Sequence, residues 1–597
     1  MWLTIIKAIG ANLFVAMAAL GFGTWFAPLF PHSLSRLARI ACTAIGGFGL
    51  LGLTLFVVGQ ISFHRWTVWL VLLVGAVSAI FERKQFRGLL VTISKVPAIV
   101  VGCVLLLTAI AGLAPPIGDW NTDGISYHYV GPKVWLRDGI IRPIPDNAPA
   151  SYPSLVEVVF AALRATGGEQ APILSASWTL GLLLAIAAAV GLRAGLDERS
   201  CWWVAALLAT MGALYEGSHS GFIDAVYAAF LLGAIHLGLN ATEKKHFVGF
   251  GFFCGLAMAT KYPALVTVPS IVLCCSWRGK ETRPWTAMST AAIALAAAFV
   301  TAGPIYLRNW LLLGTPIYPP PPAAAAYLHV KYFTTEGLTS FYQYAVWRGN
   351  GLGRGPLAFL LLPYNLTYHT ANFHGAGGIG IAPLAFGWIG LAAAWRDRFV
   401  RMLALIGLVL VSIWFATMQE SRYLISFYGI IAVFAILGWE AARRALGKRG
   451  KFLCGLAVAI SLAYGFTLMV KSRIPDLRAA CSPSYAHYRQ ETEIPYWNSF
   501  NYINGSPEVT RVLFLDRSIP AYYSDKDYVK PFGQWWEQLY VDAATPRDIL
   551  PKIEGLHPSH VLDVISAESG FQIPAHSPQY RLVFERPGQR IYQVIYR

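Results

Sequence analysis

Long apolar runs alternate with short polar segments over most of the chain. Runs long enough to cross a bilayer as a helix recur from residue 10 to residue 470. By length and flanking residues we count about fourteen such runs. They are expected near 8–28, 40–58, 66–81, 96–114, 172–191, 200–215, 222–240, 247–260, 262–277, 286–305, 379–395, 400–416, 423–440 and 452–470. The pattern predicts a polytopic α-helical membrane protein in which Lys261-Tyr262-Pro263 breaks a pair of helices.

The pattern changes after Pro475, where polar residues increase and no further apolar run of spanning length follows. Strands are expected at 509–515 and 560–566, and the segments 580–584 and 591–596 are expected to form a hairpin. Thr545 and Pro546 suit the start of a helix that runs to Leu556. We therefore expect a small C-terminal α/β soluble domain. Its sequence contains no Gly-rich phosphate loop, so we expect no nucleotide site there.

Composition and charge support the membrane assignment. Of the 597 residues, 56% are hydrophobic and 13% are charged, against about 25% charged in soluble domains. The net charge of +16 does not indicate nucleic acid, because Lys and Arg cluster in short loops between apolar runs, as in cytoplasmic loops. These loops are 82–88, 243–246, 278–283, 395–401 and 442–451.

This distribution of charge predicts a topology. The remaining polar segments would lie on the non-cytoplasmic face, at 115–170, 216–221, the turn at Lys261, 306–378, 417–422 and beyond 471. The expected location is the inner (plasma) membrane of a bacterium. The eight cysteines show no spacing that predicts a disulfide framework or a metal site.

The polar segment from Gly118 to Pro153 is the first candidate site. It holds Asp119, Asp123, Tyr127 and His128 between two apolar runs. A carboxylate that is partly desolvated at a membrane surface can have its pKa shifted and act as a general base. The alternative is a water-exposed loop with ordinary acids.

Asp224 and Lys261 are candidates because each interrupts apolar sequence. Asp224 opens a run shortly after His219, and a carboxylate there is costly unless it is paired or used. Interaction with the helix N-terminus is the alternative for Asp224. Lys261 is suited to a lipid phosphate as a point charge, or else it extends its amine to the membrane interface.

Two arginines are expected on the same face as Lys261. They occur in the pairs Arg308-Asn309 and Arg422-Tyr423, and arginine can hold phosphate oxygens with two hydrogen bonds. A single outer arginine is usually only an anchor. Three cations with two carboxylates instead suggest a site for a phosphate-linked substrate and a proton acceptor.

A divalent metal stays open at this stage. His128, His219 and His374, with nearby acids, could supply ligands, but no spacing requires them.

Four motifs together resemble the GT-C membrane glycosyltransferases, the superfamily of the protein O-mannosyltransferases and the lipid A aminoarabinose transferase. They are DGISYHYVGPKVWLRDG at 123–139, SYP at 151–153, GLAMATKYP at 255–263, and the pair GPIYLRNWLLLGTPIYP at 303–319 and ESRYLIS at 420–426. The resemblance covers about residues 96–470. It implies a GT-C-like transmembrane catalytic module at 96–474 with outer loops 115–170 and 306–378. Extra N-terminal transmembrane helices would occupy 1–95, and a periplasmic α/β domain would occupy 475–597.

The resemblance also implies an activity: inverting transfer of a sugar from a polyprenyl-phosphate sugar donor to an envelope lipid, glycan or protein acceptor. It implies that Asp123 is the general base, with Asp119 as the alternative and Asp224 as a second acid. Lys261, Arg308 and Arg422 would face the donor phosphate. Contacts to substrate would come from Tyr127, His128, Tyr152, His219, Asn309 and Tyr423.

Two other functions remain open from the sequence. A transporter or flippase for a lipid-linked or anionic substrate would also need outer cations, but we find no convincing internal repeat of the kind that transporters show. A non-catalytic scaffold that displays residues 475–597 does not explain the acidic first loop.

Overall fold

The computed structural model describes residues 2–82, 94–118, 122–144, 147–217, 221–277, 283–333, 335–345, 350–375, 378–516, 519–530, 550–564, 573 and 577–596. By its internal contacts the chain divides into two compact units. Unit 1 comprises Met1–Ala114, Pro153–Ile305 and Gly349–Cys481, and unit 2 comprises Pro115–Tyr152, Tyr306–Arg348 and Ser482–Arg597.

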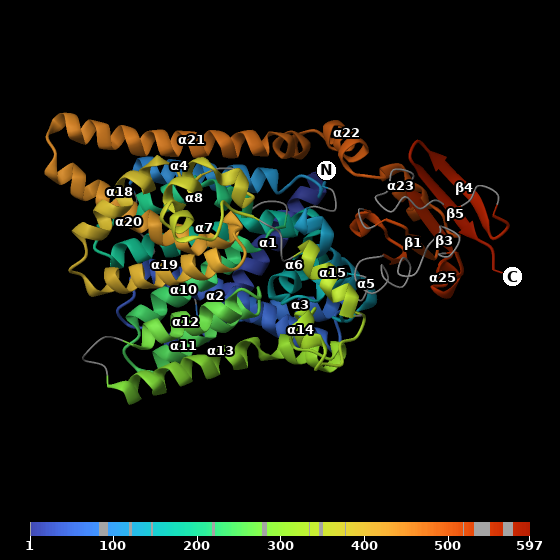
Figure 1. The fold of residues 1–597 in the computed structure, drawn as a ribbon, viewed down its shortest axis with the longest axis horizontal. Coiled ribbons are helices and arrows are strands. Elements are labelled where there is room, and N and C mark those ends of the chain that lie inside the picture. Colours follow the sequence, from blue (N-terminus) through green and yellow to red (C-terminus); the bar gives the residue numbers. More distant parts are fainter. Residues whose placement is uncertain are drawn as a thin grey trace. The chain divides into compact units, whose positions relative to one another are not determined.

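Unit 1 is a bundle of helices (Figure 1). Its α-helices are α1 Trp2–Thr24, α2 Arg36–Gly59, α3 Arg65–Phe81, α4 Lys95–Ala111, α6 Leu155–Gly167, α7 Gln170–Arg193, α8 Cys201–Ala209, α9 Gly212–Gly217, α10 Asp224–Asn240, α11 Lys244–Met258, α12 Ala264–Ser276, the first part of α13 Pro284–Leu313, α16 Pro356–Leu360, α17 Leu362–Tyr368, α18 Ile381–Ala393, α19 Arg398–Ala416, α20 Ile425–Ala445 and α21 Lys448–Cys481. Short 3₁₀ turns occur at η1 Ala27–Leu29, η5 Thr370–Phe373 and η6 Ser421–Leu424.

Membrane-spanning helices are numerous in this unit. In the described parts of the chain, seven helices are long and apolar enough to cross a membrane, and α3, α4, α10, α12 and α18 are shorter apolar helices. The seven are α1, α2, α7, α13, α19, α20 with the preceding turn, and α21. The predicted polytopic helical fold is confirmed, whereas the count of about fourteen spans stays a prediction.

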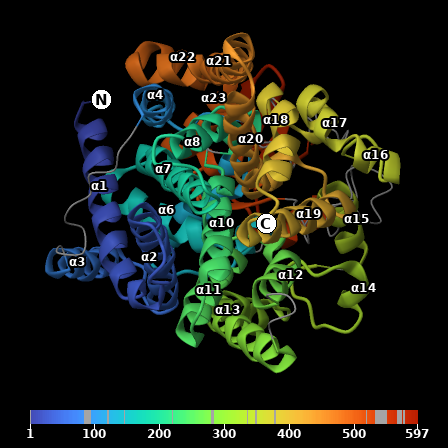
Figure 2. The same cartoon turned by 90° about the vertical axis from the view of Figure 1, so that its left-hand side faces the viewer.

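Small residues bring neighbouring helices close together. A Cβ on Gly390 of α18 would lie 1.9 Å from the Phe434 carbonyl oxygen of α20, and a Cβ on Gly438 would lie 2.0 Å from the Phe386 carbonyl oxygen. Figure 2 shows α18 and α20 side by side. Close backbone contact through glycine is typical of membrane helices, because lipid supplies no hydrophobic force that drives apolar helices together.

The segment predicted at 115–170 contains a helix that was not expected. Residues 115–170 were expected to form a polar outer segment, but α6 occupies Leu155–Gly167 within it and packs against α1, α2 and α7. Even Glu157 of α6 is buried. The helix was missed because its apolar stretch is shorter than a membrane span and contains a charged residue. In contrast, the predicted break at Lys261 is present between α11 and α12.

The segments of unit 2 that precede its C-terminal part form short helices. They are η3 Gly124–His128, α5 Val130–Asp138, η4 Ala148–Ser151, α14 Pro322–Ala325 and α15 Thr335–Ala345, together with the end of α13. A small hydrophobic core joins segments far apart in sequence, and it contains Ala148, Leu313, Tyr318, Phe333, Leu338 and Phe341. The segment after α13 therefore has a core of its own, with aromatic residues from both sides of the proline run.

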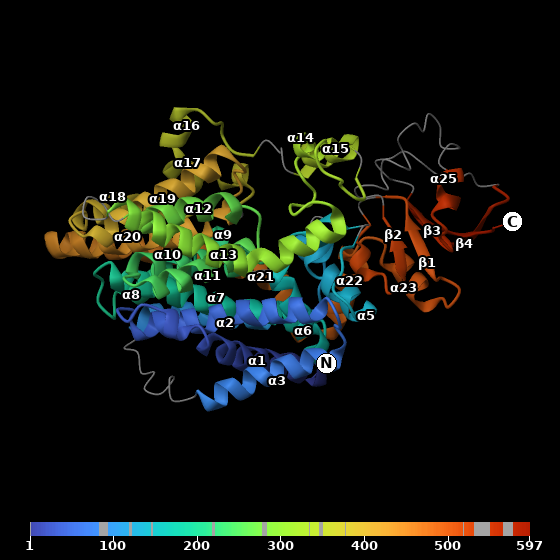
Figure 3. The same cartoon turned by 90° about the horizontal axis from the view of Figure 1, so that it is seen from below.

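The C-terminal part of unit 2 holds a five-stranded mixed sheet (Figure 3). It contains α22 Pro483–Glu493, α23 Trp497–Gly505, β1 Arg511–Phe514, η7 Ala521–Tyr523, β2 Asp527–Val529, α25 Leu550–Gly555, β3 His560–Val564, β4 Tyr580–Arg586 and β5 Gln589–Val594. The strand order is β2-β1-β3-β5-β4, with β1 parallel to β2 and β3, and β5 antiparallel to β3 and β4. The predicted small α/β domain is confirmed, although β2, α22 and α23 were not expected. The expected helix start at 545–546 lies outside the described residues.

Candidate active site

Asp224 and Lys261 form an ion pair inside unit 1. Asp224 is the first residue of α10, and Lys261 lies in the break between α11 and α12. The Lys261 Nζ donates a hydrogen bond to Asp224 Oδ1 at 2.6 Å, where the lysine side chain is 10% exposed and the aspartate side chain is fully buried. A buried charge is tolerated when it is paired. The break between α11 and α12 thus places the Lys261 ammonium next to the Asp224 carboxylate at the start of α10.

Arg422 extends this cationic group. Its Nε lies 3.0 Å from Glu420 Oε2, and its guanidinium carbon lies 4.8 Å from the Phe222 ring centroid. The Tyr423 ring lies 4.7 Å from Lys261 Nζ and 5.2 Å from the Arg422 guanidinium carbon, measured to its centroid. An aromatic face attracts cations, so Tyr423 lies beside both basic residues.

The resulting charge cluster comprises Phe222, Asp224, Lys261, Glu420, Arg422 and Tyr423. Its two cations and two carboxylates are largely buried, so their interactions are less screened than those of surface charges. An ammonium has three hydrogens and a guanidinium has five, and neither group accepts a hydrogen bond. Positively charged donors of this kind suit an anionic group such as a phosphate.

Asp123 lies in unit 2 at an unusual helical turn. It directly precedes η3, a one-turn π-helix in which the Tyr129 N–H donates to the Gly124 carbonyl at 2.8 Å. The Asp123 side chain is half-buried. Single π-turns occur frequently at functional sites because the wider turn redirects side chains. The local backbone is consistent with a carboxylate presented at a defined position.

The aromatic residues around this turn contact one another. The ring centroids of Tyr127 and His128 are 4.1 Å apart, and those of Tyr127 and Tyr152 are 5.9 Å apart. Asn147 fastens the two parts of the segment, because its Nδ2 donates to the Ser126 carbonyl at 2.7 Å. The structure therefore brings together three of the predicted substrate-contact residues.

Arg308 and Asn309 are both buried, in the part of α13 that belongs to unit 2. The Asn309 Nδ2 donates to the Ser151 carbonyl at 3.1 Å. This bond fixes α13 to the segment that carries Tyr152. Arg308 is thus held in a buried position next to a residue that anchors the first outer segment.

Tyr129 and Arg137 show how burial and charge act in the same segment. Burial raises the pKa of Tyr129 well above its usual value, and the nearby Tyr522 adds to this shift. The pKa of Arg137 is raised because its hydrogen bond and charge interaction with Asp138, together with Asp527, outweigh the opposing desolvation. Tyr129 is therefore a neutral phenol and Arg137 a permanent cation.

Two predicted site residues, Asp119 and His219, lie outside the described residues. Two contributors were missed. Glu420 stands two residues before Arg422, and Phe222 stands two residues before Asp224. Glu420 could have been predicted from its position close to Arg422, because a largely buried arginine usually needs a carboxylate partner. Phe222 carries no such signal, because an isolated phenylalanine in apolar sequence usually belongs to the core.

The strongest metal candidate by geometry is elsewhere. Among the described residues, one group of histidines and acids has its ligand atoms within 4.8 Å, namely His32, Glu243 and His246. It includes neither His128 nor His374. The His246 Nδ1 lies 3.1 Å from the backbone nitrogens of Thr242 and Glu243 and accepts their hydrogens. The hydrogen of a neutral ring is then on Nε2, 3.6 Å from Glu243. This arrangement fits a cap at the start of α11 better than a metal ligand set.

Comparison with solved structures identifies a similar fold. The crystal structure of ArnT from Cupriavidus metallidurans bound to undecaprenyl phosphate matches with a TM-score of 0.51 and 14% sequence identity, over 83% of this chain and 97% of that chain. ArnT in the apo state matches with a TM-score of 0.49 and 12% identity over the same shares. No family model and no curated protein matches the sequence. The expected polytopic transmembrane fold is thus confirmed, and it is similar to the fold of ArnT.

Proposed function

We propose that this chain is a membrane glycosyltransferase that moves a sugar from a polyprenyl-phosphate-linked donor to an envelope acceptor. The main support is the buried charge cluster in a fold like that of ArnT, which was crystallised with undecaprenyl phosphate. Paired cations next to apolar helices suit a ligand that joins a phosphate to a lipid tail. We place the active face on the periplasmic side of the inner membrane, because the basic loops mark the cytoplasmic side.

The proposed reaction is a single displacement with inversion at the anomeric carbon. Asp123 takes the proton from the acceptor hydroxyl or amine as the acceptor atom attacks this carbon. The bond between the anomeric carbon and the phosphate oxygen breaks, and its electron pair leaves with the lipid phosphate. Phosphate is a good leaving group, so no general acid is required. If Asp123 is not the base, Asp119 takes its place.

We assign the donor phosphate to Lys261, Arg422 and Arg308. The lipid phosphate gains negative charge in the transition state, and preorganised cations stabilise developing charge. Asp224 and Glu420 keep Lys261 and Arg422 in position and balance their charge before the donor binds. Asp224 is thereby the second acid of the site.

Contacts to the sugar or the acceptor are assigned to Tyr127, His128, Tyr152, His219, Asn309 and Tyr423. The acceptor is a lipid, a glycan or a protein of the envelope. In this proposal residues 96–474 form the catalytic module, 1–95 add helices to it, and 475–597 form a periplasmic domain. The polyprenyl-phosphate sugar donor would reach the site from the membrane.

The test is transfer of a radiolabelled sugar from a panel of polyprenyl-phosphate sugars to cell-envelope acceptors in proteoliposomes. Asp123→Asn should lower kcat by at least about a hundredfold, the usual contribution of a general base, while binding of undecaprenyl phosphate is kept. Glu169→Gln is the matched control, because Glu169 is an exposed acid paired with Arg164. Transfer by Asp123→Asn at the wild-type rate would move the base to Asp119 or Asp224. If no donor supports transfer, substrate movement across the membrane becomes the better reading.

A further inference from the structure

The C-terminal domain holds the Asp123 segment from one side through Tyr523. The Tyr523 hydroxyl, on η7, lies 3.0 Å from the Gly118 nitrogen and accepts its hydrogen. The same hydroxyl can donate to the Gly118 carbonyl at 3.1 Å or the Pro116 carbonyl at 3.3 Å. Tyr523 is buried, with 8% of its surface exposed. Its hydroxyl therefore fixes the backbone five residues before Asp123.

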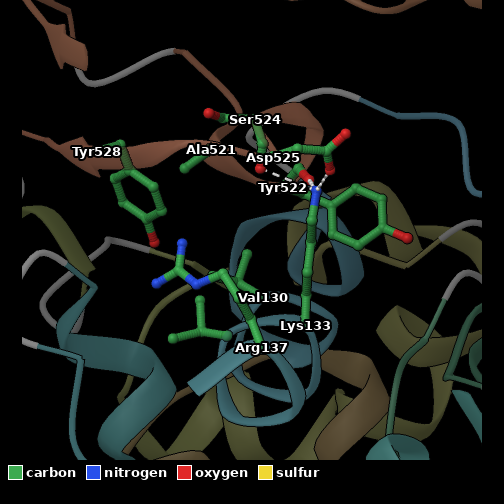
Figure 4. A pocket seen from close by; sticks show the side chains of 9 residues that line it. Val130, Lys133, Arg137, Ala521, Tyr522, Ser524, Asp525 and Tyr528 are labelled. Atoms are coloured by element: carbon green, nitrogen blue, oxygen red, sulfur yellow. Dashed lines mark hydrogen bonds and ion pairs between the residues drawn. The ribbon is translucent and has the colours of Figure 1, made fainter. Parts of the chain in front are cut away.

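Lys133 fastens the other side of the segment. This residue is on α5, ten positions after Asp123. Its Nζ donates to the Tyr522 carbonyl at 2.8 Å and to the Ser524 carbonyl at 2.9 Å, and it lies 2.6 Å from Asp525 Oδ1. An ammonium has three hydrogens, and these three acceptors match them. Figure 4 shows the lysine amine directed at this group of oxygens.

Further contacts extend the same surface. Arg137, one turn after Lys133, has its Nη1 2.8 Å from Asp527 Oδ1 at the start of β2. The Tyr129 and Tyr522 ring centroids are 6.1 Å apart. A cavity of about 220 Å³ remains between α5 and the segment from η7 to β2. α5 is thus tied to the domain along the face that surrounds this cavity (Figure 4).

We propose that the C-terminal domain positions the catalytic segment, and that Tyr523 and Lys133 are its positioning residues. This inference rests on the proposed function. Asp123 lies between the two fastened points, and a catalytic group acts well only when its neighbours restrict it to the productive geometry. The acceptors for Lys133 are mainly backbone carbonyls, so the contact depends on the folded path of η7 and the following turn. The domain thereby restricts the position of the general base without itself touching the substrate.

The test compares Lys133→Gln, Tyr523→Phe and Lys133→Arg in the full chain in proteoliposomes. Hydrogen exchange of the amides at 122–138 should become on the order of tenfold faster in the first two variants, because the lost hydrogen bonds involve a charge or a buried hydroxyl. In the transfer assay kcat should fall by about tenfold, with the KM for the polyprenyl-phosphate donor unchanged. Lys133→Arg should recover most of kcat, since arginine keeps the charge and the donors. Lys526→Gln is the matched control, a substitution of a half-buried lysine on the same turn.

The outcomes separate this inference from the proposed function. Unchanged exchange at 122–138 in both Lys133→Gln and Tyr523→Phe would overturn the contact itself. Faster hydrogen exchange at 122–138 with an unchanged kcat in these variants would show that the contact only holds the segment to the domain, and it would overturn the positioning role. A wild-type chain that transfers no sugar, yet exchanges faster at 122–138 in both variants, would overturn the function and retain the contact as a structural one.

Discussion

The ion pair of Asp224 with Lys261 is the residue-scale feature that best separates a site from ordinary membrane packing. Removing two charges from water is costly, and a pair of apolar residues of similar size is often equally stable. A fully buried aspartate and a nearly buried lysine are therefore more easily explained by use than by stability. Glu420 and Arg422 repeat the same arrangement at the start of η6.

Asp563 gives a pH prediction at the same scale. It is buried in β3, and its Oδ2 accepts the Ile573 N–H at 3.0 Å. Burial raises the pKa of Asp563 to about 6, against about 3.9 in an unfolded chain. The folded domain therefore holds an extra proton between these values. Its stability falls as pH rises from about 4 to about 6 and stays low above this range.

Asp563→Asn should remove this penalty. At pH 8 hydrogen exchange of β3 in the full chain should be at least about tenfold slower in the variant than in wild type, because two pKa units correspond to about 3 kcal/mol. At pH 4 the difference should largely disappear. Comparison at equal pH cancels the intrinsic exchange rates. A variant that exchanges faster than wild type at pH 8 would disprove the assignment of Asp563 as a destabilising buried acid.

Glycines control the approach of helices at the element scale. Gly390 and Gly438 each face a backbone carbonyl of the opposite helix at about 2 Å from their would-be Cβ atoms. Backbone carbonyls cannot move away as a flexible side chain can, so α18 and α20 must separate if a methyl group is added. Separation loses packing contacts along the whole helix pair.

Gly390→Ala should therefore lower the Tm of the purified chain by several degrees, which corresponds to a loss of about 1–3 kcal/mol from overpacking. Gly387→Ala, in the same helix, is the control, since a Cβ there has no atom within 4 Å. Thermal unfolding in detergent measures both variants. Equal Tm values for the two variants would contradict the close approach of α18 and α20.

Much of the helical architecture was predictable from the sequence, because apolar length and basic loops report directly on membrane spans. The break at Lys261 followed from a cation and a proline between two apolar runs. The helix α6 was not predictable in this way. Its apolar stretch is shorter than a membrane span and contains the charged residue Glu157, so it reads as part of a polar segment. The strand β2 was missed because Asp527–Val529 is too short for an alternating pattern.

At the same scale, the candidate site was only partly accessible to sequence reasoning. The cations and Asp224 could be singled out because charges are rare in apolar sequence. The pairing of Lys261 with Asp224 could not be read, since 37 residues separate them. The contacts of Lys133 and Tyr523 were also hidden, because they join the Asp123 segment to residues 389 and 405 positions away in the chain. Such pairings are set by tertiary structure and leave no local pattern.

At the scale of the whole molecule, the chain combines a helical membrane unit with a second unit, which is built from residues 115–152 and 306–348 and a C-terminal part that contains the sheet. Each unit holds part of the proposed machinery: the charge cluster is in unit 1, and Asp123, Tyr127, His128, Tyr152, Arg308 and Asn309 are in unit 2.

The central claim is that the chain uses a polyprenyl phosphate, and binding of radiolabelled undecaprenyl phosphate to the purified full chain tests it most directly. We predict saturable binding by wild type. The paired substitutions Asp224→Asn with Lys261→Met, and Glu420→Gln with Arg422→Gln, keep the net charge and should each weaken binding by tenfold or more, as expected for losing a charge-assisted hydrogen bond. Lys331→Gln, at an exposed lysine after α13, should bind like wild type. Absence of saturable binding, or equal affinity in both paired variants and wild type, would contradict the account.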